Sequence, residues 1–334
     1  MLILSDDYAD EDLIGHDDYC DGLVEIIRSV ESCGSFTIGV YGQWGSGKTS
    51  LLKQIQNTLD YRNSDDLRPI VTVWFNPWQF ISEEHLIVPF FHTLIAALSK
   101  KTEESKKEKW AENVSAFVQK IVQVPLALTY GLETEFNIFF LKAKLSGAKV
   151  MDHQKEEEKA IDKNRSKKKE TAMQVAAQQY ESMYYNLFTI LQEAADNLAV
   201  KIVVFIDDLD RCLPEKAVQL LEGLKVLLDL HNFVFVMGVA QEVIERGIRV
   251  RYRELFLAGQ AGDLPNIEGQ YLDKIIQFPF SLPSADSSRL RDDIIRKQLE
   301  KMKGAVSYVD IVHESLGNNP RTIKRFINAV SWLC

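Results

Sequence analysis

The amino-acid sequence predicts an α/β protein: a mostly parallel sheet flanked by helices, with a helical insert and a C-terminal helical lid. Three observations support this prediction. Short, almost entirely apolar runs of strand length recur along the chain, as expected of parallel strands covered on both faces. Stretches with helical apolar spacing alternate with them. Between the first such strand and the next helix stands Gly42-Gln43-Trp44-Gly45-Ser46-Gly47-Lys48-Thr49, which fits the pattern G-x-x-x-x-G-K-[ST] in full.

This glycine-rich run has the surroundings that phosphate binding requires. An apolar strand, Phe36 to Tyr41, precedes it, and apolar residues at helical spacing follow it from Leu51 to Leu59. The glycines let backbone N–H groups turn toward a polyphosphate, and the helix N-terminus adds its positive dipole end. We therefore predict a site for nucleotide and Mg²⁺, with Lys48 on the β- and γ-phosphates and the Thr49 hydroxyl on the metal. The predicted binding residues are Gly42, Gln43, Trp44, Gly45, Ser46, Gly47, Lys48, Thr49 and Ser50.

A second site is predicted where the apolar run Ile202 to Ile206 ends in Asp207-Asp208-Leu209-Asp210-Arg211. Carboxylates at the C-terminal end of a parallel strand lie at the edge where open α/β sheets bind ligands. We expect Asp207 to serve Mg²⁺ and Asp208 to act as general base or to orient the attacking water. The alternative is an acidic turn that caps the next helix, with Asp210 as N-cap ahead of Pro214. For Asp210 both interpretations stay open.

Five stretches together resemble the KAP family of P-loop NTPases, a STAND-like group of the additional-strand class. They are Tyr41 to Ser50, Phe75 to Trp78, Asp207 to Cys212, Tyr271 to Ile276 and Asn319 to Phe326, which span nearly the whole chain. The family includes plasmid phage-exclusion proteins and a neuronal ankyrin-repeat scaffold. The resemblance implies an additional-strand NTPase core, ATP as the nucleotide, and a long insert between the P-loop and the acidic strand.

The predicted organisation is a core of residues 1–99 and 179–283, a charge-rich helical insert of residues 100–178, and a helical lid of residues 284–334. Pro279 and Pro283 close the predicted core. Beyond the elements already given, the pattern predicts strands at 69–75, 233–239 and 275–280, and helices at 18–31, 86–98 and 218–230.

Whether the chain crosses a membrane depends on the length of the apolar runs in the insert. Its longest uncharged run, Ile121 to Leu132, is twelve residues with Pro125 inside, whereas a span needs about 20. We therefore expect no transmembrane span, and we expect that a short linker can replace residues 100–178 without loss of ATP binding. The helical stripe of the insert packs on the core or serves as an interfacial or partner-binding helix. That stripe consists of Val114, Phe117, Val118, Ile121 and Val122.

The lid and the tip of the 233–239 strand bear on catalysis. The family carries an arginine at the start of the last helix, and Arg321 is the residue expected to reach the phosphates and couple nucleotide state to lid position. Related proteins often carry a polar sensor at the strand tip, where this chain has Ala240 beside Gln241. Either Gln241 substitutes for that sensor or hydrolysis is weakened. The predicted catalytic residues are thus Asp208, Lys48 and Arg321.

Other residues keep two interpretations each. Arg211 and Lys274 either reach a neighbouring subunit as arginine fingers do or form structural salt bridges. Residues 1–27 are either a solvated acidic arm or a flap over the nucleotide. The flap follows from the resemblance, because related NTPases carry a short apolar-Gly-Arg motif against the adenine where this chain has Leu13 to His16, with His16 in place of the arginine. Lys324 and Arg325 are expected to be solvated or to pair with the acidic N-terminus. Packing in the core and at strand edges is expected of Trp74, Phe75 and Trp78.

Composition narrows the function further. The net charge is −9, and residues 1–27 carry nine acidic groups without a lysine or arginine, so nucleic acid is an unlikely partner. The four cysteines are widely spaced, which predicts a cytoplasmic protein. A peripheral membrane contact stays open. We expect an ATPase whose nucleotide state drives conformational change or assembly with a protein partner or in a homo-oligomer. The alternative is a nucleotide-gated signalling or defence switch or scaffold with little hydrolysis.

Overall fold

The computed structural model describes residues 15–30, 35–62, 69–104, 109–122, 189, 191–224, 230–251, 267–300 and 305–333. Its centre is a sheet of five parallel strands in the order β2-β3-β4-β1-β5. The predicted α/β class with a parallel sheet flanked by helices is confirmed. The strands are β1 Phe36–Tyr41, β2 Ile70–Phe75, β3 Lys201–Ile206, β4 Phe233–Val239 and β5 Phe278–Ser281.

The strand register brings the ends of four strands to one edge. Phe75 pairs with Ile206, and Ile206 pairs with Met237, while Tyr41 pairs with Val239. Every residue of β3 and β4 is buried, which explains why both strands are almost entirely apolar, with Lys201 at the start of β3 as the exception. Consequently the P-loop after β1, the acidic run after β3 and the turn after β2 all begin at the same edge of the sheet.

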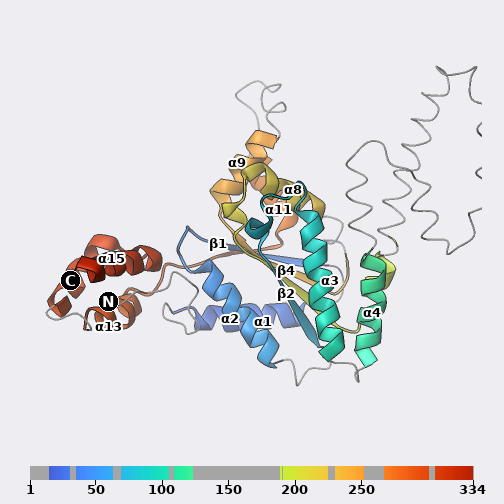
Figure 1. Ribbon diagram of the computed structural model, residues 1–334, viewed down its shortest axis with the longest axis horizontal. Coiled ribbons are helices and arrows are strands. Elements are labelled where there is room, and N and C mark those ends of the chain that lie inside the picture. The colour runs from blue at the N-terminus through green and yellow to red at the C-terminus, as the bar shows by residue number, and fades with distance from the viewer. Residues whose placement is uncertain are drawn as a thin grey trace, which may run out of the picture.

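Helices cover both faces (Figure 1). The first face carries α1 Asp17–Ser29 and α2 Lys48–Tyr61, which share one apolar cluster with the strands. The second face carries the other cluster, to which the remaining core helices contribute. These are α3 Ile87–Glu104, α4 Lys109–Ile121, α8 Pro214–Leu224, α9 Gln241–Arg251 and α11 Ile267–Ile275, with the short turns η2 Pro77–Phe80 and η3 Leu209–Arg211 at the strand ends.

A buried lysine fastens α1 to the sheet. Lys201 begins β3, and its Nζ donates to the carbonyls of Ile27, Arg28 and Val30 at 2.7, 2.9 and 2.9 Å. These carbonyls lie at the C-terminal end of α1, where intrahelical partners run out and the helix dipole favours a cation. The C-terminal end of α1 is therefore held to the start of strand β3.

The first part of the predicted insert belongs to the core. Helix α3 continues across the boundary placed at residue 100, and α4 packs beside it. Within the predicted stripe, Val114, Phe117 and Ile121 are buried and Val118 is partly buried, whereas Val122 is 47% exposed. The expectation of a packed stripe is thus confirmed for the first four residues and wrong for Val122, because that residue follows the last turn of α4. The rest of the insert lies outside the described residues.

Across the residues that the structure describes, no helix combines the length and the apolar composition needed to cross a membrane.

The last strand starts later than predicted. Ile275 is the final residue of α11, and β5 begins only at Phe278. Leu272, Ile275 and Ile276 are buried at helical spacing in the second-face cluster, so the helix keeps these residues from the strand. Pairing with β1 starts where Gln277 N donates to the Thr37 carbonyl.

The C-terminal region forms a helical lid with its own apolar cluster. Figure 1 shows its helices gathered apart from the rest of the chain. Its elements are α12 Ser287–Arg289, η4 Leu290–Arg296, α13 Lys297–Leu299, η5 Ala305–Tyr308, α14 Val309–Leu316 and α15 Pro320–Leu333.

Candidate functional site: a phosphate-binding loop and an acidic strand end

The P-loop connects β1 to α2 in a conformation that requires its glycines. Gly45 and Gly47 have φ of +80° and +103°, which lie in the left-handed region that residues with a Cβ rarely adopt. Gly47 is the N-cap of α2, a helix of 14 residues. The loop therefore ends on a helix N-terminus whose first backbone N–H groups have no partner within the helix, the arrangement that binds phosphate elsewhere.

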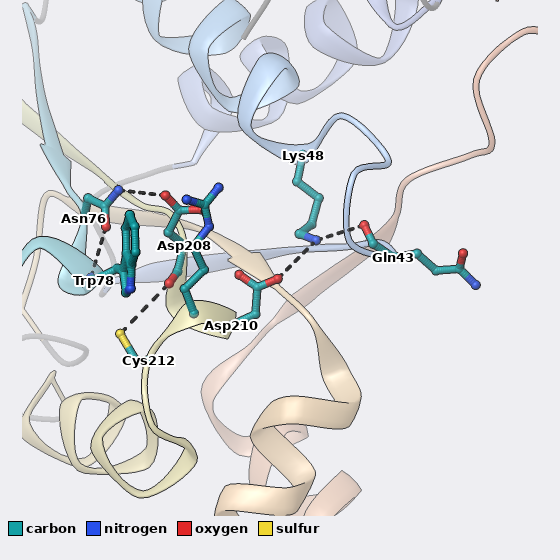
Figure 2. Close-up of polar contacts among 8 residues, drawn as sticks. Gln43, Lys48, Asn76, Trp78, Asp208, Asp210 and Cys212 are labelled. Carbon is teal, nitrogen blue, oxygen red and sulfur yellow. Dashed lines mark hydrogen bonds and ion pairs between the residues drawn. The ribbon is translucent and has the colours of Figure 1, made fainter. Parts of the chain in front are cut away.

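Lys48 folds back over the loop (Figure 2). Its Nζ donates to the carbonyls of Gly42 and Gln43 at 2.8 and 3.1 Å and lies 3.8 Å from Asp210 Oδ2. Only 8% of the residue is exposed. Burial lowers the pKa of this amine, and the nearby Asp210, Asp207 and Asp208 carboxylates oppose the shift. The amine is thus a cation held in a sparsely hydrated position at the mouth of the loop.

Asp207 and Thr49, the two residues predicted to hold the metal, lie together. The Thr49 side chain hydrogen-bonds to the Asp207 carboxylate, which is 97% buried. Burial raises the pKa of Asp207, Asp208 raises it further, and the Thr49 hydrogen bond opposes both. Gly238 in β4 leaves room for this carboxylate, since a Cβ there would lie 3.0 Å from Asp207 Oδ1. The metal role of both residues remains a prediction.

Asp208 is held on the other side of the strand end. Its φ is +57°, and its Oδ2 accepts a hydrogen bond from Asn76 Nδ2 at 2.8 Å. Arg211 Nε lies 2.8 Å from Asp208 Oδ1. Asn76 has no role predicted from the sequence, although it follows β2, the strand that pairs with β3. Adjacency of these two strand ends is the signal that could have identified it.

Asp210 is not a helix cap. Helix α8 begins at Pro214, directly after Leu213, while Asp210 sits inside the turn η3. That turn carries its carboxylate to the Lys48 amine, so the capping interpretation is wrong. The Asp210 carboxylate forms the ion pair with the P-loop lysine that is drawn in Figure 2.

The aromatic residues at the end of β2 and in the turn η2 differ in environment. Phe75 is fully buried, and Trp74 stacks on Phe205 with ring centroids 5.8 Å apart, as expected of packing residues. Trp78 is instead 46% exposed, and the Arg211 guanidinium lies over its ring at 5.0 Å. The packing interpretation is therefore wrong for Trp78, because η2 turns this side chain out of the core. Arg211 forms the structural salt bridge that was one of its two interpretations.

The lid meets the tip of the P-loop. Arg321 lies over the Trp44 ring at 4.2 Å, and Arg325 lies over it at 5.3 Å. Asn319 Nδ2 donates to the Trp44 carbonyl at 3.0 Å. The structure thus brings Arg321 to the phosphate-binding loop, on the indole of Trp44. Its contact with phosphates remains a prediction.

Two further predicted features are the tip of β4 and the turn that ends at His16. Gln241 begins α9, and its Nε2 donates to Glu245 Oε1 at 2.8 Å, so the amide is bonded to its own helix. Ala240 precedes it directly after β4. His16 is buried beside Tyr19, but Leu13 and Ile14 lie outside the described residues.

Comparison with known proteins agrees with this geometry. A family model described as "KAP family P-loop domain" matches residues 16–333. The phage T7 exclusion protein of Escherichia coli (strain K12) is 22% identical over 355 residues, which cover 97% of this chain and 42% of that protein. The human kinase D-interacting substrate of 220 kDa is 31% identical over 67 residues, covering 20% of this chain and 4% of that protein. The chain therefore spans less than half the length of these curated relatives.

Among solved structures, the Aeropyrum pernix ORC2 protein in ADPNP–ADP complexes aligns with a TM-score of 0.46. Its sequence identity is 14%, and the alignment covers 98% of this chain and 64% of that chain. A likeness at this level carries no conclusion about function.

Proposed function

The chain belongs to the KAP family of P-loop domains, and from this membership we propose that it binds ATP with Mg²⁺ and hydrolyses it. The observation that carries the proposal is the meeting of two distant segments at one sheet edge. Lys48 and Thr49 of the P-loop contact Asp210 and Asp207 of the acidic run, 160 residues away in the sequence. A turn with a capping role would not need this convergence of an amine, a hydroxyl and carboxylates.

The residues present fit a nucleotide and a divalent cation. The loop offers glycines in left-handed conformation, a helix N-terminus and the Lys48 amine to phosphate oxygens. Thr49 and Asp207 offer hard oxygen atoms, the ligands that Mg²⁺ prefers. When bound, Mg²⁺ would neutralise phosphate charge and favour attack on the terminal phosphorus. Asp207 gains from such a cation, since burial otherwise disfavours its ionised form.

In this proposal the chain's own residues divide the work. The P-loop binds and orients the phosphates, and Lys48 supplies positive charge where negative charge develops. The Asp208 carboxylate accepts a proton from the attacking water or orients it. Arg321, which lies at the P-loop tip on α15, adds a cation from the lid and links lid position to nucleotide state. Through this link, nucleotide state would drive a conformational change, or assembly with a protein partner or with further copies of the chain.

A second candidate function is a nucleotide-gated switch with little hydrolysis. It is favoured by Ala240 at the tip of β4 and by the engagement of the Gln241 amide with Glu245. Under this alternative the protein would act in signalling or defence, as the name of the phage T7 exclusion protein suggests for that relative. Turnover distinguishes the two candidates.

Nucleotide binding is tested by thermal unfolding with and without MgATP. A ligand that binds only the folded state contributes about 2.7 kcal/mol at a hundredfold excess over Kd, so the Tm should rise. Lys48→Ala should remove most of that rise, whereas Lys100→Ala, which changes an exposed lysine of α3, should keep it. An unchanged Tm of the unmodified chain at millimolar MgATP would refute the binding site.

Hydrolysis is tested by steady-state phosphate release. Asp208→Asn should keep nucleotide bound and slow turnover by about 10²-fold, the scale expected for loss of a positioned acid–base group. Asp207→Asn should instead reduce the dependence on Mg²⁺. Equal turnover in Asp208→Asn and the unmodified chain would mean that another residue is the base. Nucleotide-dependent mass in solution, measured alongside, reports assembly.

A further inference from the structure

We propose that Asn76 and Arg211 form a two-sided clamp on the Asp208 carboxylate that restrains ATP hydrolysis until it opens. This inference rests on the proposed function, because Asp208 is the proposed base. It assigns a role to Asn76 and replaces the subunit-contact interpretation of Arg211 with regulation inside one chain.

The first side of the clamp is Asn76, whose amide orientation is fixed by its two partners. Its Oδ1 accepts a hydrogen bond from Trp78 N at 3.0 Å and so caps η2. Its Nδ2 therefore points the other way and donates to Asp208 Oδ2 at 2.8 Å. The paired ends of β2 and β3 hold both residues at this separation.

The second side is Arg211, three residues after Asp208 in the turn η3. Its Nε lies 2.8 Å from Asp208 Oδ1, and its guanidinium lies over the half-exposed ring of Trp78 at 5.0 Å. Since Trp78 also donates its backbone N–H to Asn76, the four residues form a closed ring of contacts. Figure 2 shows Asp208 on the Asn76 side of the site and Asp210 beside Lys48.

The ring occupies both oxygens of the proposed base. One oxygen accepts a hydrogen bond from a neutral amide, and the other forms an ion pair with a guanidinium. Backbone φ of +57° at Asp208 is uncommon for a residue with a side chain and requires support from its surroundings. The carboxylate near the P-loop lysine is that of Asp210. These two contacts hold the carboxylate on the Asn76 side of the site, so it must be released before it can turn toward water beside the phosphates.

Two substitutions of Asn76 remove its hydrogen bond to Asp208 while keeping an acceptor for the Trp78 backbone N–H. Asn76→Ser and Asn76→Asp retain an oxygen that accepts from Trp78 N, because Ser and Asp cap helical turns as Asn does. Ser cannot reach in place of the amide donor, and Asp presents a like charge to Asp208. Both variants should raise kcat for ATP by at least about fivefold, the lower range of coupling between sites, with KM within about twofold.

Arg211→Gln removes the ion pair with Asp208 and should also raise kcat by about fivefold or more. The matched control is Arg251→Gln, since Arg251 of α9 pairs with Glu222 at 3.0 Å, away from the strand ends. That control should leave kcat unchanged. Within the Asp208→Asn background none of these substitutions should change kcat, because the clamp acts only through Asp208.

A second readout needs no turnover. In nucleotide-free protein, Arg211→Gln and Asp208→Ala remove two ends of one contact, so their effects on Tm should not add. The double variant should unfold within about 2 °C of the less stable single variant. Additive Tm losses would show that the ion pair is not a shared contact.

A kcat that falls or stays unchanged in both folded Asn76 variants would overturn the clamp, since Asn76 would then support Asp208 or leave it unaffected. An equal rise with Arg251→Gln would overturn it as well. If no variant exceeds the Lys48→Ala background while MgATP still raises the Tm, the clamp fails but nucleotide binding stands. If MgATP raises the Tm of no variant, the proposed function itself fails.

Discussion

Asn319 links the lid to Trp44 of the phosphate-binding loop through both ends of one side-chain amide. Its Nδ2 donates to the Trp44 carbonyl at 3.0 Å, and its Oδ1 accepts from the backbone N–H groups of Arg321 and Thr322 at 3.1 and 3.2 Å. The first turn of α15 is thereby capped by the residue that holds the loop. A Cβ on Gly45 would approach Asn319 Oδ1 to 2.8 Å, so a glycine is required at this close contact.

We predict that Asn319→Asp separates capping from loop contact. The carboxylate still caps α15, but it cannot donate to the Trp44 carbonyl and repels it. Loss of one hydrogen bond of about 1 kcal/mol should speed amide hydrogen exchange in 320–333 by about fivefold and weaken the response of this segment to MgATP.

The control for this experiment is Asn318→Asp. Asn318 precedes Asn319 but bonds to Ser287 within the lid. Its substitution should leave the exchange response of α15 to MgATP unchanged. Equal responses in the two variants would mean that the Asn319 contact does not transmit nucleotide state.

Asp207 should make the nucleotide-free protein less stable as the pH rises. Burial and the neighbouring Asp208 raise the folded-state pKa of this carboxyl above its ordinary value. Between the unfolded and folded pKa values the folded state binds more protons, so the free energy of unfolding falls with increasing pH. The loss of stability is complete above the folded-state pKa.

Asp207→Asn removes this cost and should raise the Tm of nucleotide-free protein at pH 8. The gain should shrink as the pH is lowered toward the unfolded pKa, where the carboxyl is protonated in both states. Thermal unfolding from pH 4 to pH 8 measures this. A Tm difference that does not vary with pH would show that ionisation of Asp207 is not its cause.

Phe117 should contribute strongly to stability although it lies in the segment predicted as an insert. Its side chain is 1% exposed and packs against Phe233 with ring centroids 5.8 Å apart. Phe117→Ala should lower the free energy of unfolding by about 3–5 kcal/mol. Val122→Ala, at the exposed end of the same stripe, should change it by less than about 0.5 kcal/mol. Denaturant titration of both variants decides the matter.

Because α4 packs in the core, the protein should tolerate only a deletion that leaves α4 in place. Removing residues 100–178 would take Val114, Phe117 and Ile121 out of the core. Replacement of residues 123–178 by a flexible linker should instead preserve the fold and the MgATP-dependent rise in Tm, because the segments proposed to contact phosphate lie elsewhere. A folded deletion variant that no longer responds to MgATP would place part of the site within 123–178.

The local sequence pattern was sufficient to predict two of the strands, the P-loop and the position of Asp207. Strands β1 and β4 match their predicted bounds, because each is an apolar run between turn residues. The P-loop follows from one spacing of glycines, lysine and threonine, since the conformation it needs is set by neighbouring residues. The placement of Asp207 at the sheet edge follows from the rule that parallel strands share one direction.

Tertiary structure decided which groups meet across that edge. Asn76 reaches Asp208 because β2 lies beside β3, and strand order is not encoded in the pattern of either strand. Asp210 turns to Lys48 rather than to α8, and Asn319 reaches Trp44 across 275 residues of sequence. The boundary of the insert likewise depends on whether α4 finds an apolar face to cover. Propensity and spacing act over a few residues, whereas these contacts depend on how the whole chain packs, so only the folded structure contains them.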